Sequence, residues 1–295
     1  MNKITIGILS MIVLSTPIAF ADSERNEKLE FAGTLEETLG HFWALEMNLD
    51  ENNAELALVH ATHPISELYE TMSEHLESNP DFAQKLQSTL LGLKDKVSTD
   101  VNREQTQLAI NDAKKIIQEA REIVIGHKLS DESEFKMQLI NQLLETSKVE
   151  YKEAIVNGII EEIAEFQDGS AFIWQSQQIF NTIEGVDPID SERINNYYEK
   201  VWADFDIQAD PTDVTNSIDA VIYEFEELSG IQSVTSEHEE VYLASLAPLK
   251  QLKEGVEPKD VQCKSSMKLI FKHSGDPACV KSTSVQKLVS YGWAQ

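Results

Sequence analysis

Two histidines three positions apart, His60 and His63, have the spacing of neighbours on one helix face, and Pro64 follows them directly. Residues i and i+3 point to the same side of an α-helix. Two imidazoles and a carboxylate from a neighbouring helix form a common transition-metal site. Glu46 is the first candidate for that carboxylate, because a short connection would pack the two helices antiparallel. Glu67 and Glu70, one or two turns after the histidines, are further candidates. Alternatively, either histidine only caps its helix C-terminus, where a cation is favoured.

A second group of acidic residues lies within positions 161–168. Glu165 and Asp168 share a helix face through their i, i+3 spacing, and Glu162 lies at the edge of the apolar stripe. A carboxylate at the edge of an apolar face is costly unless it is paired or bound to a cation. The pattern predicts oxygen ligands for iron or another cation. The alternative is a solvated acidic face, which is what runs of charge usually form.

The elements that must position these groups are helices. Apolar residues recur at helical spacing between positions 34 and 246, with short turns and almost no alternating segments. Thr34-x-x-Glu37 has the form of a capping box and predicts a helix over 34–48. Further helices are predicted over 54–63, 65–76, 80–97, 102–125, 190–205 and 211–228. Residues 132–183 are predicted as one long helix, or as two joined near Asn157-Gly158.

The predicted fold class is therefore mainly α, a multi-helix bundle followed by a small α+β module. In 102–125 the expected inward stripe is Leu108, Ile116, Ile117 and Ile123. After Pro248 the pattern changes to two short β-favouring segments, 267–272 and 277–281, and a closing helix that ends at Tyr291.

The chain has only two cysteines, Cys263 and Cys279. In an exported chain such a pair favours a disulfide over a metal or redox pair, and a loop of this size contributes about 3 kcal/mol. We therefore predict an acidic all-α domain over 22–247 and a disulfide-stapled module over 248–295.

The N-terminal pattern predicts a secretory signal peptide over residues 1–21. Lys3 provides a positive start, residues 4–14 are apolar, and Ala19-Phe20-Ala21 fits the small-x-small cleavage rule. The alternative is a retained anchor, although the apolar run is short for a membrane span. We expect an exported protein that works in the cell-envelope space or is secreted.

The net charge of −27, from 24 basic and 51 acidic side chains, excludes some partners. It argues against nucleic-acid binding and against docking on anionic lipid, and it favours attraction of cations. The sequence has no Gly-x-Ser-x-Gly, P-loop, dinucleotide fingerprint or His-Glu-x-x-His, and the remaining histidines, including His41, are isolated. We expect a non-catalytic protein.

Two stretches carry a resemblance to a known family. One is residues 53–64; the other is Tyr151-x-x-Ala154-x-x-x-Gly158-x-Ile160 followed by Glu165-Phe166-Gln167-Asp168. Together they resemble the extracytoplasmic helical domain that precedes the membrane part of some bacterial iron permeases of the oxidase-dependent type, over about residues 34–183. The membrane helices of those permeases are not found here. The resemblance implies a domain that captures or regulates metal, with a permease as a possible partner.

The tail carries a second resemblance. Asp260-Val261-Gln262-Cys263, Pro277-Ala278-Cys279 and Gly292-Trp293 are similar to a short domain that recurs on exported proteins of ammonia-oxidising archaea. It implies an archaeal origin and export. The leading hypothesis is thus an exported metal-binding accessory protein, for iron or another transition metal. The alternative is a structural or interaction module that binds a cell-envelope protein and has no metal site.

Overall fold

The computed structural model describes residues 17–99, 102–230, 248–253, 256–263 and 267–294. These residues fall into two compact units, one up to Ser229 and one from Gly230 onward. The predicted domain boundary between 247 and 248 adjoins residues outside the described ranges and stays a prediction. The predicted signal segment also lies largely outside them, since the first described helix begins at Pro17.

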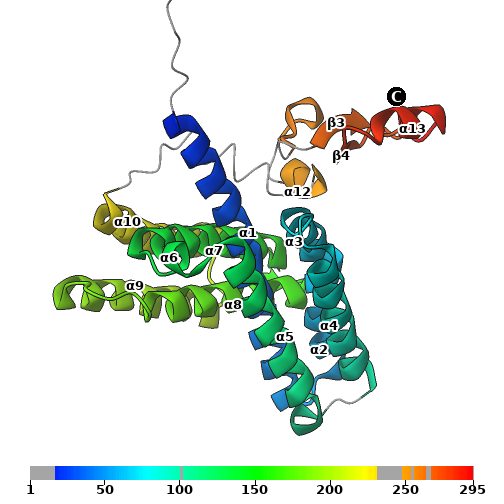
Figure 1. The fold of residues 1–295 in the computed structure, drawn as a ribbon. Helices are drawn as coiled ribbons and strands as arrows, with labels where there is room; N and C mark the ends of the chain where they lie inside the picture. Colours follow the sequence, from blue (N-terminus) through cyan, green and yellow to red (C-terminus); the bar gives the residue numbers. More distant parts are fainter. Residues whose placement is uncertain (1–16, 100–101, 231–247, 254–255, 264–266, 295) are drawn as a thin grey trace, which may run out of the picture. The chain divides into compact units, whose positions relative to one another are not determined.

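The first unit is helical, as the apolar spacing predicts (Figure 1). Its first half comprises α1 (Pro17–Asp50), α2 (Ala54–His63), the π-helix η1 (Pro64–Leu68), α3 (Tyr69–His75), α4 (Pro80–Thr99) and α5 (Arg103–Val124). Its second half comprises α6 (His127–Ser130), α7 (Ser133–Ala154), β1 (Ile155–Val156), β2 (Ile159–Ile160), α8 (Ile163–Phe180), α9 (Pro188–Asp206) and α10 (Pro211–Ser229).

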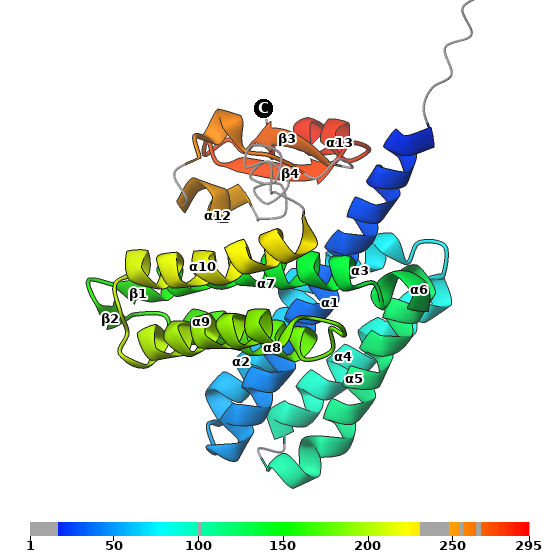
Figure 2. The same ribbon diagram turned by 90° about the vertical axis from the view of Figure 1, so that its left-hand side faces the viewer.

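The helices of this unit form two groups that cross each other (Figures 1 and 2). Helices α7 to α10 run side by side, with α7 packed on both α8 and α10. Helices α1, α2, α4 and α5 form the other group, and α1 also packs on α7 and α8. A continuous cluster of buried apolar side chains, from Phe31 to Phe225, runs through both groups. The α1–α8 contact therefore lies within a common core, where positions are held closely.

The prediction that a helix starts at Thr34 is wrong. Helix α1 passes through that position, and the Thr34 hydroxyl donates to the carbonyl of Glu30, 3.0 Å away, within the helix. Residues 22–33 contain Glu, Lys, Leu and Ala and no proline, so nothing in them stops a helix. The capping-box pattern at Thr34 is thus a fortuitous match inside a longer helix.

The segment 132–183 forms two helices, which resolves the alternative left by the sequence. A hairpin joins α7 to α8, pairing Ile155 with Ile160 and Val156 with Ile159. Its two turn residues, Asn157 and Gly158, have φ of 54° and 75°. Both residue types tolerate positive φ, which a two-residue hairpin loop requires. The hairpin directs α8 back along α7.

The inward stripe predicted for 102–125 is partly wrong. Ile116 and Ile117 are buried on α5, but Leu108 and Ile123 are 76% and 44% exposed. Ile110, together with the shorter side chains Thr106, Ala113 and Ala120, completes the buried face instead. The contact of α5 with α1 and α4 accepts short side chains at these positions.

The second unit contains α12 (Pro248–Lys253), η2 (Pro258–Asp260), β3 (Met267–Phe271), β4 (Pro277–Lys281) and α13 (Val285–Ser290). Strands β3 and β4 are antiparallel, with Leu269 opposite Cys279. The predicted Cys263–Cys279 disulfide is present, with Cα atoms 5.6 Å apart. The mainly helical fold with a small disulfide-stapled C-terminal sheet is confirmed.

A buried candidate metal centre

Three histidines and one aspartate from three helices meet in the core of the first unit. His41 comes from α1, His60 and His63 from α2, and Asp168 from α8. The Nδ1 atoms of His41 and His60 lie 2.7 and 3.0 Å from Asp168 Oδ1, and His63 Nδ1 lies 3.0 Å from Asp168 Oδ2. One ligand atom from each residue lies within 4.8 Å of all the others. We call these four residues the His3Asp cluster.

The cluster is almost closed to solvent. His60 is fully buried, His41 and Asp168 are 2% exposed, and only His63 keeps some exposure. His63 Nδ1 forms an aligned hydrogen bond with Asp168. In contrast, His41 Nδ1, His60 Nδ1 and Asp168 Oδ1 are buried and have no hydrogen bond of acceptable geometry. Buried polar atoms without such a partner are rare and costly. Here they point to a ligand that would join them.

Burial and neighbouring charges shift the pKa of two cluster members. Burial raises the pKa of Asp168, but the imidazoles of His41, His60 and His63 outweigh it and hold that pKa well below its usual value. Burial lowers the pKa of His63, whereas Asp168, Glu67 and Glu165 raise it, and the net pKa is raised. Asp168 is therefore an anion at neutral pH, which is the form that binds a cation.

The α1–α2 hairpin brings His41 to the other two histidines. Glu51 and Asn52 make the turn, and Asn53 caps α2 by accepting from the Leu56 amide. His41 lies 11 residues before Asn52 (52 − 41 = 11) and His63 lies 11 after it (63 − 52 = 11). Two helices folded back at one turn place such equidistant residues opposite each other.

The expectation that His41 is isolated is therefore wrong. His41 is isolated only along the sequence; in the fold its ring centroid lies 5.1 Å from that of His63. The equal distance of His41 and His63 from the turn was the signal in the sequence that would have identified it. Phe172 of α8 also contacts the His41 ring edge-on, at 5.4 Å between centroids.

Helix α2 ends at His63, as predicted, but the chain continues as a π-helix rather than stopping. Pro64 begins η1, and α3 follows without an intervening loop. Pro64 has no amide hydrogen to donate, and a π-turn absorbs that break within a continuing helix. Single π-turns are frequent at functional sites, and this one adjoins His63.

Three of the predicted ligands lie outside the His3Asp cluster. Glu46 forms ion pairs with Lys114 at 2.7 Å and Arg103 at 3.2 Å, linking α1 to α5. Its position on α1 explains this: Glu46 lies five residues after His41 (46 − 41 = 5), so at about 100° per residue it points to a different face of the helix. Asp168 supplies the carboxylate that Glu46 was expected to provide.

The three predicted ligands in the acidic segment 161–168 lie in different surroundings. Glu162 is exposed at the start of α8. Glu165 is half-buried and groups with Glu150 and Glu153 of α7, with one oxygen from each within 4.8 Å of the others. Only Asp168 reaches the histidines. All three of these donors are carboxylates, which suit hard cations rather than a transition ion, so the His3Asp cluster is the stronger candidate for a transition metal.

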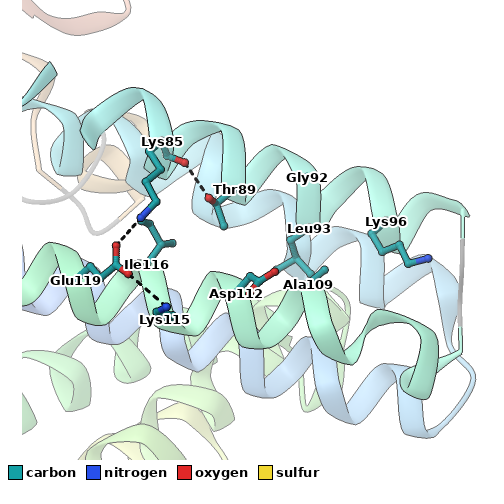
Figure 3. A pocket seen from close by; sticks show the side chains of 10 residues that line it. All are labelled: Lys85, Thr89, Gly92, Leu93, Lys96, Ala109, Asp112, Lys115, Ile116 and Glu119. Carbon is teal, nitrogen blue, oxygen red and sulfur yellow. Dashed lines mark hydrogen bonds and ion pairs between the residues drawn. The ribbon is translucent and has the colours of Figure 1, made fainter. Parts of the chain in front are cut away.

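A surface groove lies between α4 and α5, and none of its lining residues belongs to the His3Asp cluster (Figure 3). Three of its charged side chains are paired: Lys85 lies 2.6 Å and Lys115 3.9 Å from Glu119. Leu93 and Ile116, which are both buried, also line it. The residues that line this groove include no histidine or cysteine.

The second half of the first unit has a recognisable relative. Residues 126–232 match the family model described as the iron permease-associated 4-helix bundle domain. The match begins just before α6, and its four long helices are α7, α8, α9 and α10. It includes the Tyr151 to Asp168 stretch that carries the resemblance, but not residues 53–64. No curated protein and no solved structure matches the chain.

The match divides the His3Asp cluster. Asp168 lies in the matched segment, whereas His41, His60 and His63 lie before it. The site is thus built where the four-helix segment meets the preceding helices. The comparisons give no support to the archaeal resemblance of the tail.

Within the described residues, no helix combines the length and apolarity that crossing a bilayer requires. The Cys263–Cys279 disulfide fits an extracytoplasmic location, where disulfides persist.

Proposed function

We propose that this protein binds a divalent first-row transition ion, with iron(II) as the leading candidate, through His41, His60, His63 and Asp168. It would serve as a non-catalytic accessory to metal uptake outside the cytoplasmic membrane. The convergence of four donor side chains from three helices in one buried cluster carries the proposal. Three donor atoms, His41 Nδ1, His60 Nδ1 and Asp168 Oδ1, make no aligned hydrogen bond there.

The donor set selects a class of metal. Imidazole suits iron, zinc, copper and nickel, whereas calcium and magnesium prefer a shell made of oxygen atoms. Three imidazoles with one carboxylate therefore favour a divalent transition ion over a hard cation. The donors do not by themselves single out iron. The match of residues 126–232 to a domain named for iron permeases supports iron, and it supports a permease as partner.

The burial of the cluster supports binding rather than catalysis. A catalytic metal site keeps a coordination position open to substrate. Here four protein donors would fill a four-coordinate shell, and the side chains of His41, His60 and Asp168 are at most 3% exposed. A closed shell of this kind would hold the ion without a position for substrate.

The direct test is titration of the purified protein under anaerobic conditions with iron(II), and with zinc(II) as a redox-inert probe. We expect one equivalent to bind with micromolar affinity or better, and magnesium not to compete. Asp168→Asn and the double variant His60→Ala/His63→Ala should each lose that equivalent while helicity is kept. The double variant His127→Ala/His273→Ala removes two exposed imidazoles and should bind as the wild type does.

A polyanion of net charge −27 also collects counter-ions, and salt separates the two cases. Exposed charges are screened between about 0.1 and 0.5 M salt, whereas buried groups are screened much less. Weak binding of several ions that disappears at the higher salt would overturn the proposal. It would then favour a structural or interaction module of the cell envelope.

A further inference from the structure

Gln167, the residue before Asp168, contacts the His60 ring on the side away from the cluster. Its Oε1 atom lies 2.7 Å from His60 Nε2, with hydrogen-bond geometry. The opposite ring nitrogen, Nδ1, faces Asp168 Oδ1 at 3.0 Å without an aligned hydrogen bond. The one well-formed hydrogen bond of the His60 ring is therefore at Nε2. Whether the amide oxygen or the amide nitrogen of Gln167 faces Nε2 decides which ring nitrogen of His60 carries the proton.

Asn48 determines the orientation of the Gln167 amide. Asn48 is 1% exposed, and its Nδ2 donates to the backbone carbonyl of Ala44 at 2.9 Å. A carbonyl only accepts, so the nitrogen of Asn48 must lie on that side. The same Nδ2 donates to Gln167 Oε1 at 2.9 Å, and Gln167 Nε2 donates to Asn48 Oδ1 at 3.4 Å. Turning the Gln167 amide over would set two NH2 groups against each other.

The acceptor facing His60 is therefore an oxygen, and His60 Nε2 must donate to it. We propose that Gln167, held by Asn48, is a positioning residue that keeps a proton on His60 Nε2 and makes Nδ1 the ligand atom. The role of Nδ1 as a ligand atom rests on the proposed function. The position of the proton on Nε2 does not depend on a metal. This inference adds a hydrogen-bond chain from the α1 backbone through Asn48 and Gln167 to the metal site.

A histidine that ligates a metal commonly donates its other N–H to a fixed acceptor, and loss of that partner typically weakens metal binding by 10- to 100-fold. Gln167 has this relation to His60. Because Gln167 and Asp168 are consecutive on α8, the same turn of helix supplies both the carboxylate and the acceptor that orients His60. A small shift of this turn would disturb both contacts.

Nitrogen NMR of the His60 ring tests the inference in the wild-type protein. In the metal-free protein we expect an Nε2 proton that exchanges slowly with water, because it is buried and hydrogen-bonded. In the zinc-loaded protein we expect the same proton, with zinc on Nδ1. A bare Nε2 in the metal-free protein, or zinc on Nε2, would overturn the inference.

Substitutions test the effect on affinity. Gln167→Met removes the acceptor at similar volume and should weaken zinc binding by about 10- to 100-fold, whereas Gln167→Glu keeps an oxygen there and should bind within a few-fold of the wild type. The matched control is Gln177→Met, on the same helix, where the lost contact is with Trp202 Nε1. Equal zinc affinity in the wild type and Gln167→Met would contradict the inference.

The two proposals fail in distinguishable ways. If the wild-type protein binds no zinc or iron(II) equivalent, the proposed function is wrong, but the slowly exchanging Nε2 proton still tests the role of Gln167. If the wild type binds tightly and His60 carries its proton on Nδ1, the metal site stands and the positioning role is wrong.

Discussion

At the scale of single residues, Asp168 is the centre of the site. It is the one member within 3.0 Å of each of the three histidines. Its lowered pKa and the raised pKa of His63 have a common origin in this arrangement, because each charge stabilises the other inside the protein. In the metal-free protein, a proton on His63 therefore compensates the buried carboxylate.

This compensation has a definite pH dependence. The pKa of His63 is raised above 6.5 in the folded protein, so its stabilising contribution is complete below pH 6.5 and is lost as pH rises through the folded value. Asp168 acts in the other direction: its contribution is present above pH 3.8 and is lost as pH falls through its lowered pKa. We expect the melting temperature of the metal-free protein to fall above pH 6.5, whereas zinc affinity rises there because imidazole must lose its proton to bind.

Melting curves with and without zinc across this pH range check the prediction. The groups that face His63 are His41 from α1, His60 from α2, Glu67 from η1, and Glu165 and Asp168 from α8. His63→Gln should flatten the decline of the metal-free melting temperature, while His127→Gln should leave it unchanged. A decline that is the same in His63→Gln and the wild type would assign the effect to another group.

At the scale of elements, the site depends on how closely α1 approaches α8. Gly40, next to His41, has no side chain where these helices meet, and a Cβ atom there would lie 2.8 Å from Phe172 Cδ1. Phe172 in turn contacts the His41 ring. A glycine in a helix interior costs stability, and here that cost permits the helix approach that brings His41 to Asp168.

Gly40→Ala should therefore harm the protein although alanine favours helices. We expect a loss of about 1–3 kcal/mol in the free energy of unfolding from overpacking, together with weaker zinc binding. Chemical denaturation and zinc titration measure the two effects.

The matched control is Gly92→Ala on α4, where a Cβ atom would meet nothing within 4 Å. That variant should gain about 0.5–1 kcal/mol and bind zinc normally. If Gly40→Ala were also stabilising and bound zinc normally, close approach would not be the reason for glycine at this position.

The elements also show how far the sequence could predict the site. The sequence predicts which residues share a face of one helix, so His60 could be paired with His63, and Asp168 with Glu165. Spacing along the chain does not predict contacts between helices, because these depend on the register of one helix against another. Glu46 was selected by type and rough proximity, and it faces Lys114 instead. The distance of His41 from the turn was the one available clue to that register.

Helix boundaries were likewise predicted correctly where a local signal marks them, and not elsewhere. The α2 end at His63 and the turn at Asn157-Gly158 are marked by proline and by a positive-φ pair, which act locally. The predicted helix start at Thr34 is wrong because Thr34-x-x-Glu37 satisfies a local rule inside a longer helix, and residues 22–33 before it contain no proline that would stop that helix. The exposure of Leu108 and Ile123 depends on which neighbours cover α5, and the sequence does not state this.

At the scale of the whole molecule, the candidate site and the disulfide belong to different compact units. All members of the His3Asp cluster precede Ser229, and both cysteines follow Gly230. The β3–β4 sheet has only two strands, and small units of this kind commonly depend on a disulfide for stability. The first unit has its own extensive core.

The double variant Cys263→Ser/Cys279→Ser should therefore separate the two units in a melting experiment. We expect the second unit to lose about 3 kcal/mol, while zinc stoichiometry and affinity stay as in the wild type. Calorimetry and zinc titration of the full chain measure these outcomes. Loss of zinc binding in this variant would mean that the disulfide supports the metal site.

The π-helix η1 sets a constraint on chain length between the histidine pair and α3. An α-helix turns about 100° per residue, and a π-turn accommodates one additional residue in the same helical run. Met72 and Leu76 after η1 are buried in the core, as His60 is before it. Deleting one residue from Pro64–Leu68 would rotate the two segments by about 100° against each other, so that both could no longer face inward. Exposed positions such as Ser66 can therefore vary in residue type, whereas the number of residues in this segment cannot.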